Sequence, residues 1–154
     1  MLHEQSFRAH GIEGAGATSP LRALGIRHLD DLPAYAYQLI KHGISSEWIE
    51  PVRQHLGVSN GELAELIGLG RRQVNRLSAN KLSLPAHAAE MMLRLLEVHD
   101  MAVDVFGSRA TACAWLSRPH PMLVGECPRT ATKTSYGAAK VKDLLVATKY
   151  SGAA

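Results

Sequence analysis

The stretch that decides the fold runs from Ser59 to Leu77 and reads SNGELAELIGLGRRQVNRL. Ser59 and Glu62 have the spacing of a capping box, in which each side chain satisfies a backbone N–H at a helix start. Apolar residues then recur at helical spacing, and Gly68 stands where a short turn needs a positive φ angle. Ala64 is small enough to let a second helix approach. The stretch therefore predicts two helices crossing tightly about a short turn, a helix-turn-helix.

The second of these helices carries its polar and basic side chains on the outer side. Val74 and Leu77 are three residues apart and face the first helix. The outward positions are left to Arg71, Arg72, Gln73, Asn75 and Arg76, and no acidic residue occurs between Glu65 and Glu90. Such side chains contact phosphates and base edges in the major groove of DNA. We therefore predict that these five residues bind DNA, the alternative being an ordinary helical hairpin with a solvated basic face.

Charge limits how strongly one copy of this motif can bind. The formal net charge of the chain is +3. The basic and acidic side chains balance over residues 1–45 and again over residues 46–99, so the excess lies after residue 99. Affinity for DNA rises with the number of phosphates that a protein neutralises. DNA binding is therefore expected to need a homodimer or a larger assembly.

The rest of the chain beyond residue 20 also shows helical rather than strand-like patterning. We expect helices over about residues 31–43, 46–56, 85–106 and 137–150, and a short helix capped by Ser108 that carries a mostly buried Trp115. A loop rich in proline and glycine separates this short helix from the helix over residues 137–150. The predicted fold class is all-α: a flexible arm over residues 1–20, a helix-turn-helix domain over 21–99 and a small helical domain over 100–154.

Composition argues against a membrane protein, a secreted protein and an enzyme. Hydrophobic residues make up 46% of the chain, but no run approaches the roughly 18 residues that span a bilayer. Residues 1–17 lack the apolar core of a signal peptide, so a cytoplasmic location is expected. Cys113 and Cys127 lack metal-ligand spacing and are expected to be reduced and buried. No set of residues has the pattern of a catalytic site or a cofactor site.

A family resemblance rests on the C-terminal third. The stretch MAVDVFG over residues 101–107 is followed by Trp115-Leu116, by a loop with Pro119, Pro121, Gly125 and Pro128, and by a helix that ends at Tyr150. This series resembles the antitoxins called Xre, MbcA or ParS, over about residues 21–154, with a Cro-like helix-turn-helix ahead of a toxin-binding part. The sequence departs from the family pattern at Arg129 and Thr130, where apolar residues are usual, at Lys149, where an acid is usual, and at Ser151, which separates Tyr150 from Gly152.

The resemblance implies a partner, a RES-type toxin that either degrades NAD or transfers its ADP-ribose to a cellular enzyme. Family members usually neutralise it by placing their C-terminal end in the toxin's NAD pocket. The residues that would do so here are Lys149, Tyr150, Ser151, Gly152, Ala153 and Ala154. After Tyr150 they are small enough to enter a narrow cleft, and Tyr150 would be a rigid aromatic anchor. Plain fraying of the terminus is the alternative.

The expected partners are therefore a RES-domain toxin and operator DNA, bound by a homodimer within a toxin–antitoxin hetero-oligomer. Two other interpretations stay open from the sequence. The chain could be a stand-alone transcriptional repressor, or an interaction module whose helix-turn-helix no longer binds DNA.

Overall fold

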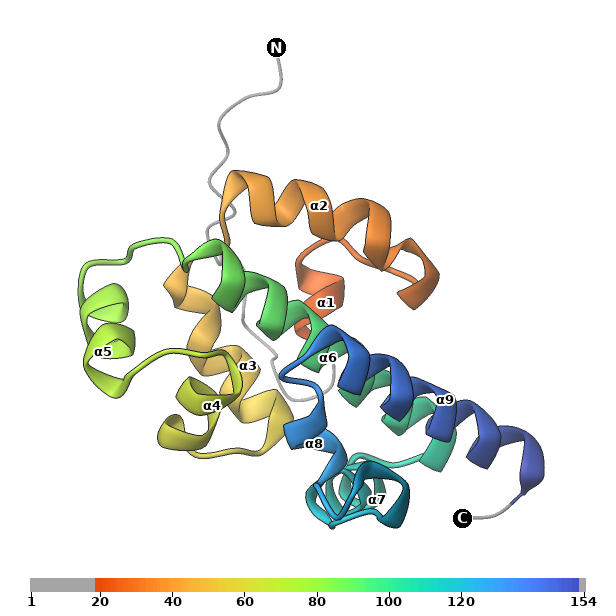
Figure 1. The fold of residues 1–154 in the computed structure, drawn as a ribbon. Helices are drawn as coiled ribbons and strands as arrows, with labels where there is room; N and C mark the ends of the chain where they lie inside the picture. The colour runs from red at the N-terminus through yellow and green to blue at the C-terminus, as the bar shows by residue number, and fades with distance from the viewer. Residues whose placement is uncertain (1–18, 153–154) are drawn as a thin grey trace. The chain divides into compact units, whose positions relative to one another are not determined.

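The computed structural model describes residues 19–152, and there the chain is built of helices and short turns (Figure 1). The elements are α1 (Pro20–Ala23), η1 (Leu29–Asp31), α2 (Leu32–His42), η2 (Ser46–Trp48), α3 (Ile49–Leu56), α4 (Asn60–Leu66), α5 (Arg71–Ala79), α6 (Ala86–Phe106), α7 (Arg109–Ser117), η3 (Pro121–Leu123), α8 (Pro128–Ala131) and α9 (Ser135–Ser151). Over residues 19–152 the sole strand-like pairing is an isolated bridge between Ser45 and Ser83. The predicted all-α class is confirmed.

Most helix ends follow the signals in the sequence, and three do not. Ser19 and Pro20, predicted as part of the arm, cap and begin α1, whereas residues 1–18 of that arm lie outside the described range. A four-residue helix, α8, interrupts the expected loop, because Pro128 is well suited to a first helical turn. The last helix begins two residues earlier than predicted, where the Thr134 side chain accepts a hydrogen bond from the Gly137 N–H, and it continues through Ser151.

The contacts divide the chain into two compact units, residues 1–90 and 91–154. The division falls inside α6, whose first five residues belong to the first unit. A boundary at residues 99 and 100 therefore cuts through a continuous helix, and our domain division there stays a prediction. No helix in the described part of the chain combines the length and the apolar character needed to cross a bilayer.

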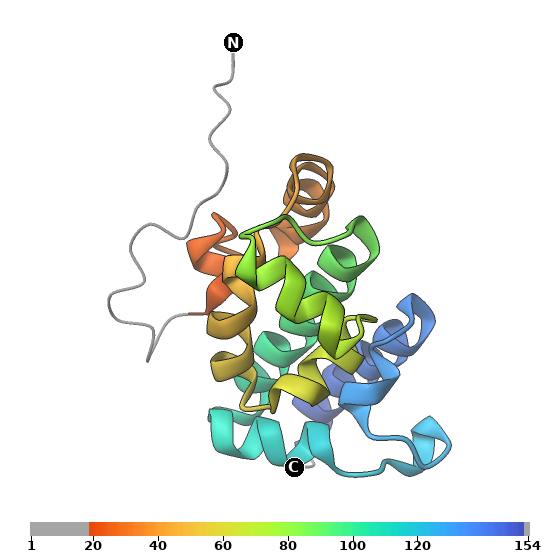
Figure 2. The ribbon, with the colours of Figure 1, turned by 90° about the vertical axis from the view of Figure 1, so that its left-hand side faces the viewer.

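In the first unit, the end of α5 is fixed to the chain ahead of α3. The buried Ser46 hydroxyl donates to the Leu77 carbonyl at 2.9 Å. Backbone hydrogen bonds from Ser46 to Leu82 and from Leu84 to Ile44, at 2.9 and 2.8 Å, flank the bridge between the two serines. The two short helices of the motif, α4 and α5, lie next to each other and beside α3 in both views (Figures 1 and 2). The orientation of α5 is thus set by hydrogen bonds as well as by its buried Leu77.

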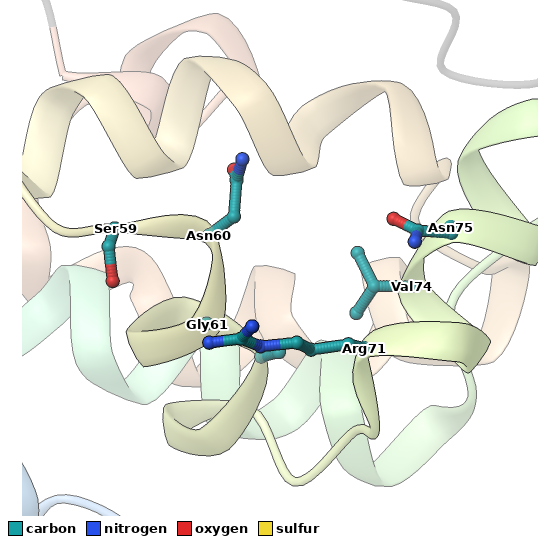
Figure 3. Close-up of a pocket in the computed structure, with 7 residues that line it drawn as sticks. Ser59, Asn60, Gly61, Arg71, Val74 and Asn75 are labelled. Carbon is teal, nitrogen blue, oxygen red and sulfur yellow. The ribbon is translucent and has the colours of Figure 1, made fainter.

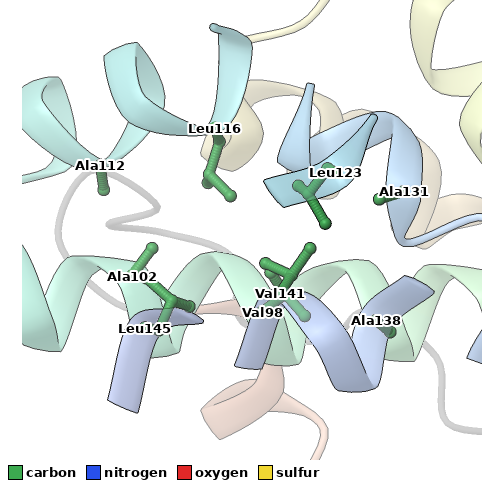
Figure 4. Packing of buried hydrophobic residues seen from close by; sticks show 9 residues of the cluster. All are labelled: Val98, Ala102, Ala112, Leu116, Leu123, Ala131, Ala138, Val141 and Leu145. Atoms are coloured by element: carbon green, nitrogen blue, oxygen red, sulfur yellow. The ribbon is translucent and has the colours of Figure 1, made fainter. Parts of the chain in front are cut away.

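In the second unit, α9 packs its inner face onto α6 and the loop before α8. The side chains of this core converge from α6, α7, η3, α8 and α9 (Figure 4). Its buried members are Val98, Ala102, Ala112, Leu116, Leu123, Ala131, Ala138, Val141 and Leu145. Four of the nine are alanines, so the helices approach each other closely. Partly buried Leu144 and Trp115 pack at its edge.

Candidate functional site

The turn between α4 and α5 has the geometry that the sequence predicts. Gly68 has φ +72°, a backbone region that residues with a Cβ rarely adopt. The Leu69 N–H donates to the Ala64 carbonyl at 2.9 Å, which closes the turn over the last residues of α4. Ser59 caps α4 by accepting a hydrogen bond from the Glu62 N–H at 3.1 Å. Ala64 is 3% exposed, as expected for the point where the two helices approach.

Four of the five predicted DNA-binding residues lie together on one exposed face of α5. Successive residues of an α-helix are rotated by about 100°, so Arg71, Asn75, Arg72 and Arg76 occupy one continuous arc. All four are exposed, whereas Leu77 is buried. Gln73 falls at the flank of this arc and is half-buried. The helix therefore presents three guanidinium groups and one amide, which match phosphates and base edges.

A cleft of about 450 Å³ opens between the start of α4 and α5. Its lining residues are Ser59, Asn60, Gly61, Ala64, Arg71, Val74 and Asn75 (Figure 3). Arg71 extends across it to the backbone of Gly61, so closely that a Cβ added there would stand 3.0 Å from the Arg71 Nε. Asn60 and Gly61 were not among the predicted site residues, although the capping box already placed them in the first turn of α4.

Arg53 of α3 forms an ion pair with Glu50 and a hydrogen bond to the segment that leads into α4. Arg53 donates from Nε and Nη2 to the two carboxylate oxygens of Glu50, at 2.9 and 2.6 Å, and from Nη1 to the Val58 carbonyl at 3.1 Å. The hydrogen bonds from Arg53 hold the pKa of Glu50 below its ordinary value. Because that pKa is depressed, the stabilisation is present above the ordinary value and is lost as the pH falls through the lowered one. An exposed ion pair of this kind adds little to the free energy of unfolding, so its main effect is on the conformation of this turn.

The predicted toxin-binding residues lie at the exposed end of α9. Tyr150 is 82% exposed and still helical. Lys149 reaches the Asp104 carboxylate at 3.3 Å, a solvent-exposed pair. Ser151 is the last helical residue, and Gly152 caps the helix with φ +66°. Ala153 and Ala154 lie outside the described residues. In this structure of the chain alone, Tyr150 and Ser151 are therefore part of the helix.

The outward face of α9 carries both apolar and charged side chains. Opposite the buried Val141 and Leu145, the exposed positions at helical spacing are Tyr136, Ala139, Lys140, Asp143, Val146, Ala147 and Tyr150. Tyr136 is 89% exposed and Val146 is 42% exposed. The apolar members of this face, Tyr136, Val146, Tyr150 and two alanines, are interrupted by Lys140 and Asp143, and we call them the α9 stripe. Exposed apolar side chains on a helix whose inner face is already packed favour contact with a partner. The α9 stripe reaches Tyr150 and so runs into the predicted toxin-binding end.

Burial in the second unit agrees with one expectation and corrects another. Trp115 is largely but not fully buried, as expected, and it packs at the core's edge with its ring centroid 5.5 Å from Phe106 and 5.9 Å from His120. Cys113 and Cys127 were expected to be buried and are only partly so; Cys127 precedes α8, and its thiol donates to the Ser117 carbonyl at 3.1 Å. The Cys113 sulfur is 3.7 Å from Nε2 of His99, whose ring is 1% exposed. Such a buried imidazole is out of reach of a substrate, and the contact links α7 to α6.

Comparisons with known proteins agree with both halves of this description. Residues 36–97 match the family model described as the antitoxin Xre-like helix-turn-helix domain. Residues 101–150 match the model described as the antitoxin Xre/MbcA/ParS C-terminal toxin-binding domain.

Two curated relatives are each named antitoxin Xre. The protein from Yersinia enterocolitica serotype O:8 is 28% identical over 107 residues, which cover 69% of this chain and 72% of the relative. The protein from Photorhabdus laumondii subsp. laumondii is 24% identical over 108 residues, which cover 70% and 73%. With its helix-turn-helix and its helical C-terminal unit, the chain belongs to the Xre/MbcA/ParS family of antitoxins.

Proposed function

We propose that this antitoxin neutralises a RES-type toxin, one that degrades NAD or transfers ADP-ribose, by placing its C-terminal end in the toxin's NAD site. The observation that carries the proposal is the end of α9, where the 82%-exposed Tyr150 stands directly before Ser151, Gly152 and two alanines. A stiff helix that presents an aromatic anchor and then small residues suits a narrow cleft. Inhibition would be competitive with NAD.

The α9 stripe supports the second part of the proposal, that the toxin is held by more than the tail. A stable protein interface needs on the order of 800 Å² on each side, which five terminal residues do not supply. Tyr136, Val146 and Tyr150 lie on one side of α9, so docking there would lead continuously into insertion of the end. Small side chains at Ala139 and Ala147 allow a partner's backbone to approach closely.

The first unit would bind operator DNA and repress the antitoxin's own operon. The exposed arc of α5 and the cleft beside it provide the contacts, with Arg71, Arg72, Asn75 and Arg76 at the surface and Gln73 at its flank. Because the charges of residues 46–99 cancel, the proposal includes a homodimer that doubles the number of phosphate contacts. It includes a cytoplasmic location and neither a catalytic step nor a cofactor.

The experiment that tests the proposal uses the toxin encoded in the same operon. The two proteins are co-expressed, and the tagged antitoxin is purified and examined for the bound toxin. NAD consumption by the toxin is then followed at rising antitoxin concentration and at two NAD concentrations. We expect a stable complex and inhibition that weakens as NAD rises. A chain that represses its promoter but neither binds nor inhibits the toxin is a stand-alone repressor, which contradicts the proposal.

A further inference from the structure

The loop between α7 and α8 exposes two apolar side chains at its tip. Met122 is 58% exposed and Val124 is 94% exposed, the highest value among the large exposed hydrophobic residues of the described chain. Leu123 between them is 6% exposed and points into the core, near Val141 (Figure 4). The loop thus uses one residue as an anchor and presents its two neighbours to solvent.

Val124 has a backbone conformation that a valine rarely adopts. Its φ and ψ are +57° and +34°, in the left-handed region, where a β-branched side chain is disfavoured by steric contact with its own backbone. In the described part of the chain, Lys81 is the other non-glycine residue with a positive φ. Its side chain is unbranched at Cβ and is strained less. Glycine at position 124 would remove the strain, so the valine side chain itself needs an explanation.

Hydrogen bonds hold the tip rigidly in this conformation. The His120 carbonyl accepts from the N–H groups of Leu123 and Gly125 at 3.0 and 3.2 Å, and its N–H donates to the Glu126 carbonyl at 2.9 Å. The His120 ring accepts from the Met122 N–H at 3.1 Å and packs edge-on against Trp115. The loop is closed at both ends and anchored at Leu123, so Met122 and Val124 form a preorganised apolar knob.

We propose that this knob, Met122 and Val124, inserts into an apolar pocket on the toxin and is a binding anchor separate from the C-terminal end. It lies within residues 101–150, the part that matches a toxin-binding domain. Residues 121–125 carry no charged side chain, so the knob suits a protein pocket rather than a phosphate backbone. A rigid anchor loses little conformational freedom on binding, and methionine adapts its shape to a pocket. The inference rests on the proposed function only in requiring that a toxin is bound, and it does not depend on that toxin being of the RES type.

The test separates strain from binding with one substitution. Val124→Gly relieves the backbone and deletes the side chain, so the variant should melt at the same or a higher temperature and yet bind the operon's toxin at least about tenfold more weakly. Met122→Ser removes the second apolar side chain without a backbone effect, and should weaken binding without changing the melting temperature. The matched control is Lys81→Gly, which relieves a positive φ in the other unit and should leave toxin affinity unchanged.

Affinity is measured by calorimetry with the full-length antitoxin, and the size of each free variant by light scattering. If the wild-type chain does not bind the toxin, the proposed function fails and the knob loses its partner. If the wild type binds and both knob variants bind equally well, the knob is overturned and the proposed function stands. A variant that alters the oligomeric state but not toxin affinity would assign the tip to self-association, which also overturns the inference.

Discussion

We expect the proposed DNA binding by the first unit to depend most on Arg71 and Arg72. They begin α5 on its exposed arc, and Arg71 crosses the cleft to the first turn of α4. Changing both to alanine should weaken operator binding by roughly 2–6 kcal/mol if both contact bases, and should flatten its salt dependence if they contact phosphates. The measurement is a gel-shift titration at several salt concentrations.

The matched control for that pair is Arg118→Ala with Lys140→Ala, which removes the same charge from exposed positions in the second unit. It should leave operator affinity nearly unchanged. Toxin neutralisation should survive the loss of Arg71 and Arg72. Equal operator affinity for wild type and the α5 variant would show that α5 is not the recognition helix.

Trp115 gives a second test at the scale of one side chain. It packs between Phe106 and His120 at the edge of the core. Because it is not fully buried, Trp115→Ala should lower the free energy of unfolding by about 2–3 kcal/mol, at or below the range for fully buried aromatic residues. Chemical denaturation checks the value. Trp115→Phe keeps part of the packing and should cost clearly less, whereas an alanine variant as stable as wild type would mean that the ring does not hold α7.

Among the elements, α8 and α9 are in close contact, and Gly137 permits it. A Cβ at Gly137 would collide with the Ala131 carbonyl oxygen, a backbone atom that cannot rotate away. Gly137→Ala should therefore destabilise the second unit by about 1–3 kcal/mol although alanine is the better helix former. Lys140→Ala, exposed on the same helix, is the control and should be nearly neutral. Thermal unfolding of both variants decides this, and an unchanged melting temperature for Gly137→Ala would show that the two helices are not in close contact.

An element could be predicted from the sequence where a few neighbouring residues determine its ends. Gly43 and Gly57 end α2 and α3, and Ser59 and Ser108 cap α4 and α7, because caps and left-handed termini are determined by a few neighbouring residues. The helix α8 was missed because four residues give no periodic pattern. Arg129 is 6% exposed and donates to the Ser117 hydroxyl at 3.1 Å, a burial that an arginine does not indicate by itself, although the family usually has an apolar residue at this position.

The candidate sites divide in the same way. The arc on α5 follows from helical periodicity, and the sequence located it except for the flank position of Gln73. The cleft beside it could not be predicted, because it depends on where Arg71 lies relative to Gly61. Val124 was passed over because a left-handed valine contradicts local preference, and only the surrounding hydrogen bonds impose it.

Across the whole molecule, the residues proposed to bind DNA and those proposed to bind the toxin lie in different parts of the chain. The exposed arginines of α5 belong to the unit that ends at residue 90. The exposed apolar residues Met122, Val124, Tyr136, Val146 and Tyr150 belong to the other unit. Substitutions in one unit should therefore leave the function of the other intact, unless the toxin and DNA compete for one assembly.

The most direct test of the account is NAD turnover by the toxin in the presence of antitoxin lacking residues 151–154. This deletion removes only the last residue of α9, its Gly152 cap and the two residues that follow, and leaves the buried Val141 and Leu145 in place. A pull-down in parallel reports whether the complex still forms. We predict a complex that forms but no longer inhibits the toxin. Full inhibition by the shortened protein would contradict it and would assign neutralisation to the surface of the C-terminal unit instead.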